Sequence, residues 1–299
     1  MNNIYSQLTK STQKKSQARL SKEEFAKEMQ QRRQYLFDMA EKQSYEAVSS
    51  SEKYKQFLDL LWRTDYTVTN ALLIMAQKPD SVMLKDSSHW RDKHLHIKKG
   101  EKGIQILEPS GEYERGDGTI GTSYNPKYVF DVSQINTKDI LYHEPEMNVE
   151  NIVTGLTYDS PVKLNMLENM DGNVPVLYSP ESKSIFYSPG LEPDVLLQGL
   201  VREYCHVEFD RQYDSYNRET CRFFVESSAY IVCRKYGINT NDQQFMNEIA
   251  DYFYGMDSKE IKKELSQIKE LSRDVSARID RGIYKTQQSK NAERNQEVR

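Results

Sequence analysis

LLQGLVREYCHVEFD, residues 196–210, contains the pattern on which the interpretation of the whole chain depends. Pro193 just before it suits the first turn of a helix, and apolar residues recur at helical spacing through the stretch. Glu203 and His206 match the glutamate and second histidine of H-E-x-x-H, but Arg202 stands where the first histidine belongs. Three interpretations follow: a metal-binding helix that has lost a ligand, an altered metal site, or a chance match.

The composition is that of a folded chain with a modest apolar content. Of 299 residues, 37% are hydrophobic, and the mean hydropathy is -0.80. No apolar run approaches the roughly 18 residues that cross a bilayer, and the first residues lack the apolar segment of a signal peptide. The three cysteines form no C-x-x-C pair, as expected of free thiols in a reducing compartment. We therefore expect a cytoplasmic protein with no membrane contact.

Composition along the chain predicts two domains with short flanking segments. We expect a mobile basic lead at 1–20, a first domain at 21–140, a linker at 141–155, a second domain at 156–282 and a disordered tail at 283–299. Basic residues are in excess in the first fifty positions, whereas acidic residues are in excess in the second domain. A polyanion should therefore bind the first half, and the acidic half offers a surface for a host or element-encoded protein.

Residue patterns predict an α+β fold for both domains. The first domain should be helical with a small sheet: helices at 21–45, 51–62 and 67–77, then strands at 104–107 and 127–135 around a glycine-rich loop at 112–124. The second domain should be mainly helical with a short antiparallel sheet. Its predicted elements are a helix at 161–170, two strands within 174–189, and helices at 192–210, 218–238, 242–254 and 258–281.

The chemistry of H-E-x-x-H is geometric. Histidines four positions apart share a helix face and bind one zinc ion, and the glutamate activates the metal-bound water. Glu226 lies 20 residues beyond His206 in the next predicted helix and could supply a third ligand. Cys205, His206 and Glu226 are an alternative shell, although Cys205 projects about 100° around the helix from His206. A helix without any metal ancestry, with Arg202 simply solvated, is the remaining alternative.

A second candidate site lies in MLKDSSHWRDKHLHIKKGEKGI, residues 83–104, where cations alternate with aromatic side chains. Cations bind phosphates and aromatic faces stack on bases, so this mixture suits a single nucleic-acid strand. The composition equally fits a solvated face with Trp90 in the core, and the three histidines of the stretch could also be considered as metal ligands. The candidate DNA-binding residues are Lys85, Trp90, Arg91, Lys93, Lys98, Lys99 and Lys102, with Tyr113, Tyr124 and Tyr128 around the glycine-rich loop as candidates to extend the stacking surface.

Several stretches resemble one known family in order and spacing. YTVTNALLIMAQKPDSVML, Trp90, KKGEKGIQILEP and YVFDVSQI resemble the N-terminal single-stranded-DNA-binding domain of ArdC-type antirestriction proteins. LLQGLVREYCHVEFD and VESSAYIVCRKYGI resemble the zincin-like metallopeptidase domain of the same family. The resemblance covers about residues 50–280. It implies a protein of a plasmid or integrative element that binds DNA entering a recipient cell and opposes restriction.

The departure from the family pattern concerns the metal. By position, the resemblance implies residue 202, His206 and Glu226 as ligands and Glu203 as general base. Arg202 has no lone pair for a metal and stays protonated, so only two protein ligands would remain. A fixed positive charge at Arg202 could instead neutralise Glu203 and Glu226 through a salt bridge. The metal ligands and the base are then vestigial.

The sequence thus predicts a single-stranded-DNA-binding, antirestriction-like protein whose zincin-like domain has lost peptidase activity. No cofactor is expected, and zinc only if the altered site is real. Two alternatives remain: an active zinc metallopeptidase with an unusual ligand set, and a non-enzymatic scaffold that binds other proteins.

Overall fold

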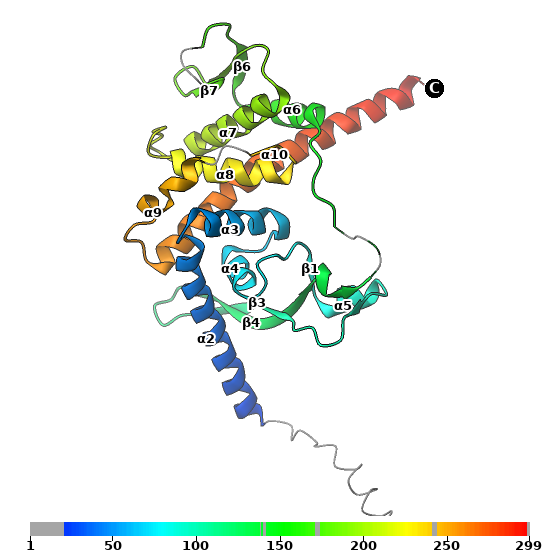
Figure 1. The fold of residues 1–299 in the computed structure, drawn as a ribbon, viewed down its shortest axis with the longest axis vertical. Coiled ribbons are helices and arrows are strands. Elements are labelled where there is room, and N and C mark those ends of the chain that lie inside the picture. The colour runs from blue at the N-terminus through cyan, green and yellow to red at the C-terminus, as the bar shows by residue number, and fades with distance from the viewer. Residues whose placement is uncertain (1–20, 138, 140–141, 171–173, 241–243, 298–299) are drawn as a thin grey trace, which may run out of the picture.

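The structure is a computed structural model that describes residues 21–137, 139, 142–170, 174–240 and 244–297. It is an α+β fold, as predicted, in which helices dominate and three small sheets lie at two ends (Figure 1). The predicted lead at 1–20 lies outside the described residues. In the described part, no helix is both long and apolar enough to cross a membrane.

The first half consists of three helices packed on a small sheet. Helices α2, α3 and α4 are capped by Ser21, Ser50 and Thr67, whose side chains accept hydrogen bonds from backbone N–H groups of the first turn. The sheet has the order β1-β4-β3, and a two-stranded ladder of β2 and β5 lies beside it. The elements are α2 Lys22–Ala47, α3 Ser51–Thr64, α4 Val68–Gln77, β1 Leu84–Lys85, α5 Ser87–Asp92, β2 His96–Ile97, β3 Ile104–Glu114, β4 Ile120–Asp131, η1 Val132–Gln134 and β5 Ile135–Asn136.

Two amides on α4 complete the hydrogen bonding of the edge strand β3. The Asn70 side chain accepts from Leu107 N–H at 2.8 Å and donates to the Leu107 carbonyl at 2.9 Å. Gln77 makes the same pair of bonds with Gln105, each at 2.9 Å. An unpaired buried backbone group costs free energy, so these amides act in place of a neighbouring strand. Both amide side chains are therefore structural, since each bonds the backbone of β3.

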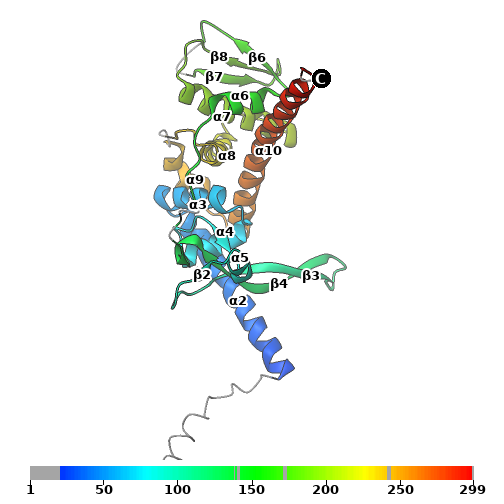
Figure 2. The same ribbon diagram turned by 90° about the vertical axis from the view of Figure 1, so that its right-hand side faces the viewer.

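Strands β3 and β4 form a long antiparallel arm that extends away from the helices (Figure 2). A bulge between Pro109 and Gly111 interrupts the register. At the tip, Gly118 has a φ of 80°, and Asp117 accepts a hydrogen bond from Thr119 N–H at 2.9 Å. The predicted strands are confirmed but are longer than expected, because much of the glycine-rich stretch is paired.

The second half places a three-stranded sheet on a layer of helices. The sheet order is β6-β8-β7, with β6 parallel and β7 antiparallel to β8. The two predicted strands within 174–189 are confirmed and pair antiparallel, and β6 adds a parallel strand that was not predicted. The elements are α6 Val149–Thr157, β6 Lys163–Met166, β7 Val176–Ser179, β8 Ser184–Tyr187, α7 Pro193–Gln212, α8 Arg222–Lys235, η2 Gln244–Glu248, α9 Ile249–Tyr252 and α10 Ser258–Glu297.

Four element predictions differ from the structure. The helix expected at 161–170 is replaced by strand β6, because its apolar residues alternate and pair with β8. The linker expected at 141–155 already contains α6, which Asn148 caps through a bond from Asn151 N–H at 2.9 Å. The tail expected to be disordered is helical to Glu297, because good helix formers continue α10. The helix expected at 242–254 is divided into η2 and α9.

One hydrophobic core extends through both halves. It includes residues of α3, α4, α7, α8 and α10. At the α3–α8 contact, the rings of Tyr54 and Phe223 stack at 5.5 Å, and the Tyr54 hydroxyl donates to Ser227 Oγ at 2.8 Å. The predicted division into two domains stays a prediction, but the helices of the two halves are packed against each other.

Asn70→Ala should lower the free energy of unfolding by about 1–3 kcal/mol, because it leaves the N–H and the carbonyl of Leu107 buried without partners. Urea unfolding measures the change. The matched control is Asn125→Ala at an exposed position of β4, which should cost less than about 0.5 kcal/mol. Equal values for the two variants would show that α4 does not complete the sheet edge.

Candidate functional site: a buried glutamate between two arginines

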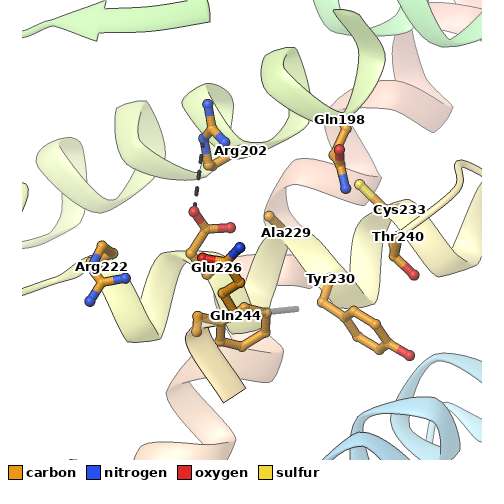
Figure 3. Close-up of a pocket in the computed structure, with 10 residues that line it drawn as sticks. Gln198, Arg202, Arg222, Glu226, Ala229, Tyr230, Cys233, Thr240 and Gln244 are labelled. Carbon is orange, nitrogen blue, oxygen red and sulfur yellow. Dashed lines mark ion pairs between the residues drawn. The ribbon is translucent and has the colours of Figure 1, made fainter. Parts of the chain in front are cut away.

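The candidate site lies between α7 and α8, beside strand β7. A pocket of about 200 Å³ opens there, and Figure 3 shows Gln198 and Arg202 on one side of it and Glu226 on the other. The close approach of α7 to β7 depends on Gly199, because a Cβ at that position would lie 2.5 Å from Val176 Cγ2. A larger residue would push the helix away from the strand and move Glu203, one turn further along α7.

Glu203 is the centre of the site. Its side chain is fully buried, and each carboxylate oxygen accepts two hydrogen bonds. Arg218, in the loop before α8, donates to Oε2 at 2.8 Å and to Oε1 at 2.7 Å. Arg202 Nε donates to Oε1 at 3.0 Å, and the backbone N–H of Tyr178 donates to Oε2 at 2.8 Å. Glu203 therefore has little capacity left to bind or activate a water molecule.

The charge on Glu203 is stabilised by its partners. Burial alone would raise the pKa of this carboxyl, but the hydrogen bonds from Arg218 and the charges of nearby groups outweigh burial and hold the pKa below its usual value. Glu203 is thus ionised at neutral pH. The negative charge is enclosed by two guanidinium groups.

Arg202 connects three groups at the edge of the pocket. Besides its bond to Glu203, Arg202 Nε lies 4.0 Å from Glu226 Oε1 (Figure 3). Its Nη2 donates to the Val176 carbonyl at 3.4 Å. The interpretation of Arg202 as a simply solvated side chain is therefore wrong. Its salt bridge to Glu203 and Glu226 was predicted, but the bidentate contact belongs to Arg218.

The Nδ1 of His206 contacts two uncharged side chains. Its Nδ1 lies 3.2 Å from the Tyr216 hydroxyl and 3.7 Å from Cys221 Sγ. Burial lowers the pKa of His206 to about 3, so its imidazole is neutral at pH 7. Burial also raises the pKa of the Cys221 thiol to about 11, which keeps the thiol protonated and unreactive. His206 is a packed, neutral member of the core.

Glu226 is the acidic group that the arginines satisfy least. Burial raises the pKa of Glu226 above its usual value, against the opposing effect of Arg202, and the neighbouring Glu203 carboxylate adds to the increase. Within the part of the chain that the structure describes, its one ion pair is the 4.0 Å contact with Arg202 Nε. Its carboxylate borders the pocket, as Figure 3 shows.

The arrangement does not fit a divalent cation. Arg202 stands at the first ligand position without a lone pair, only His206 and Glu226 remain of the predicted ligands, and Arg202 and Arg218 would repel a dication. Cys205 is fully buried, and the described residues contain no group of three potential ligands, neither with Cys205 nor among the histidines of 83–104. The predicted base and ligands are brought together without forming a metal shell.

The sequence did not identify Arg218. It lies in an irregular loop 12 residues after His206, and no helical or strand periodicity relates it to Glu203. Residue patterns predict neighbours on one element, whereas the path of a loop depends on tertiary packing. The only available signal was chemical: two buried acids, Glu203 and Glu226, on predicted apolar helices require more than one cation.

The candidate DNA-binding cations all lie on the surface of the first half. No carboxylate of the described residues pairs with Lys85, Lys93, Lys98, Lys99 or Lys102, whereas Arg91 has only an exposed contact with Asp92 at 4.0 Å. Lys98 Nζ donates to the Ser133 carbonyl at 2.6 Å, which holds the turn without cancelling the charge. The six cations are therefore free to attract an anion.

The candidate aromatic residues are placed differently from one another. Trp90 is only 1% exposed, and its indole N–H donates to the Phe130 carbonyl at 3.1 Å, so the stacking role predicted for Trp90 is wrong. Its place in the core was the alternative. Tyr113 is half exposed on the arm, about 25 Å along β3 from the body of the sheet. Tyr124 is partly buried, and its ring makes a T-shaped contact with the ring of Phe37 on α2.

The fold is similar to that of an antirestriction protein of known structure. The similar protein is ArdC from the R388 plasmid, whose metal-free crystal structure superposes with a TM-score of 0.54 at 15% sequence identity. Its Mn(II)-bound structure gives a TM-score of 0.57 at 14% identity. Each comparison covers 82% of this chain and 98% of ArdC, so the predicted resemblance is confirmed in the fold. No protein-family model and no curated protein sequence matches the chain.

Arg218→Ala should destabilise the protein by about 3–5 kcal/mol, because it leaves a buried carboxylate without its bidentate partner. Arg202→Ala removes one hydrogen bond to the same group and should cost about 1–3 kcal/mol. Urea unfolding of the two variants measures both losses.

The control for Arg218→Ala is Arg91→Ala, whose side chain is 75% exposed and lies 4.0 Å from the equally exposed Asp92. This exposed pair should be worth less than about 1 kcal/mol. Adding Glu203→Gln to Arg218→Ala should restore part of the lost stability, since the unpaired charge is removed. If Arg218→Ala costs no more than Arg91→Ala, Glu203 does not depend on this arginine.

Proposed function

We propose that this chain is a single-stranded-DNA-binding, antirestriction-like protein of a mobile genetic element, with a metallopeptidase-like half that is catalytically inactive. The observation that carries the proposal is a fold shared with ArdC over 82% of this chain and 98% of ArdC. ArdC is described as an antirestriction protein of a plasmid. Both halves take part in the match, so the likeness is not limited to one common domain.

The charge distribution supports a DNA partner for the first half. Exposed lysines without carboxylate partners gather in residues 83–104, in particular Lys98, Lys99 and Lys102 around a glycine turn. Cations left unpaired attract phosphates and release counterions on binding. The acidic residues of the second half favour the same division of roles, because they would repel the strand.

The geometry around Glu203 supports inactivity. A general base must reach the water that it deprotonates, and the oxygens of Glu203 already accept four hydrogen bonds. The free edge of strand β7 is also occupied. An added peptide strand would pair with the Val176 carbonyl and the Tyr178 N–H, but Arg202 donates to this carbonyl and Glu203 accepts from this N–H. The vestigial base thus helps to close the sheet edge beside the pocket.

Charge reversal at Lys98, Lys99 and Lys102 should weaken binding of single-stranded oligonucleotides of every sequence alike. The slope of log affinity against log salt should fall by roughly two to three, because up to three phosphate contacts are lost. Fluorescence anisotropy with labelled oligonucleotides over a range of salt concentrations measures both effects.

The matched control reverses three exposed lysines of α10: Lys259, Lys263 and Lys285. This variant has the same net charge as the first but changes the opposite half of the chain. It should keep most of the affinity. Equal losses in the two triple variants would show that net charge alone attracts the DNA, and unchanged affinity in the first would remove residues 98–102 from the interface.

A further inference from the structure

A solvent-exposed tyrosine is held in place beside the turn that carries Lys99 and Lys102. Tyr128 on β4 is 40% exposed. Its ring rests against Gly103, where a Cβ would come within 2.8 Å of Tyr128 Cδ1. On the other side, Arg32 of α2 donates from Nη2 to the Tyr128 hydroxyl at 2.7 Å, with its guanidinium carbon 5.4 Å from the ring centroid. Helix and turn together fix an aromatic ring at the surface.

An exposed aromatic ring that is held in place is well suited to stack on a base. A tyrosine that is already ordered loses little side-chain entropy when another ring stacks on it. The Arg32 guanidinium lies over the ring and donates to its hydroxyl, and Tyr128 as a whole remains 40% exposed. Trp90, the residue expected to stack, is enclosed in the core and cannot do so.

The charges on both sides of Tyr128 are unpaired. In the described part of the chain, no carboxylate forms an ion pair with Arg32 or Arg33 on α2, nor with Lys99 or Lys102 on the turn. Lys127, the neighbour of Tyr128 in sequence, differs: its ammonium contacts Asp86 at 3.2 Å and Glu108 at 2.7 Å. The turn on one side of Tyr128 and α2 on the other thus both carry unpaired positive charges.

We propose that Tyr128 is the base-stacking residue of the single-stranded-DNA site, and that the strand passes from the Lys98–Lys102 turn over Tyr128 onto α2. Arg32 and Arg33 contact phosphates on one side of the stacked base, and Lys99 and Lys102 do so on the other. A rigid aromatic ring between two groups of cations is the arrangement that single strands require, and stacking is tolerant of base identity. This inference rests on the proposed DNA-binding function and adds α2 to the interface.

The test uses the full chain and a labelled oligothymidylate in fluorescence anisotropy. Tyr128→Ala should weaken binding by about ten-fold or more, because stacking on an aromatic side chain contributes strongly to the affinity for each base. Tyr128→Phe keeps the ring and should bind within about two-fold of the unmodified protein. Arg32→Ala should weaken binding and lower the salt slope by about one, whereas Arg32→Lys should keep that slope.

Tyr254→Ala is the matched control, because Tyr254 is 88% exposed and lies in the other half of the chain. It should leave binding unchanged. A second readout does not depend on a destabilised variant: photo-crosslinking of the unmodified protein to an oligonucleotide that contains 5-iododeoxyuridine should give a crosslinked peptide containing Tyr128.

The outcomes separate the two proposals. If the unmodified protein binds no single-stranded DNA, the proposed function and this inference both fail. If it binds but Tyr128→Ala and Tyr254→Ala behave alike and the crosslink forms elsewhere, only the inference is overturned. A loss in Tyr128→Phe equal to that in Tyr128→Ala would overturn stacking in favour of the hydroxyl contact with Arg32.

Discussion

The buried carboxylate of Glu203 is the constraint on which the second half of the structure depends. A charge without solvent must be matched by donors from the protein, and here they come from three elements: α7 itself, the loop before α8, and the edge strand β7. The same four hydrogen bonds therefore join a helix, a loop and a sheet. Removing any donor would leave charge uncompensated in the core, so the local chemistry and the fold cannot vary independently.

The same constraint explains how α7 and α8 can bury two acids side by side. Where a dication would neutralise several acids, Arg202 and Arg218 carry two fixed charges and bring directional hydrogen bonds. The arginines satisfy Glu203 fully and Glu226 only in part, and His206 is left neutral with Tyr216 and Cys221. This arrangement maintains the packing of α7 on α8, and the proposed loss of peptidase activity rests on it.

Sequence patterns predicted what depends on local periodicity. The helices around Glu203 and Glu226, the strands around residues 174–189 and the capping of α2 follow from spacing and cap residues. What the patterns missed depends on packing between distant segments: the parallel pairing of β6 with β8, and the reach of Arg218 from a loop. Trp90 shows the same limit, since composition cannot distinguish a ring that stacks on a base from one that fills the core.

The central claim is that two arginines, and no divalent cation, neutralise the centre around Glu203. Its most direct test measures the unfolding temperature of the metal-free protein as Zn(II) or Mn(II) is added, because a ligand that binds the native state raises this temperature by mass action. We predict no saturable rise with either ion. A saturable rise that disappears in His206→Gln or Glu226→Gln would contradict the account, because these residues would then be metal ligands.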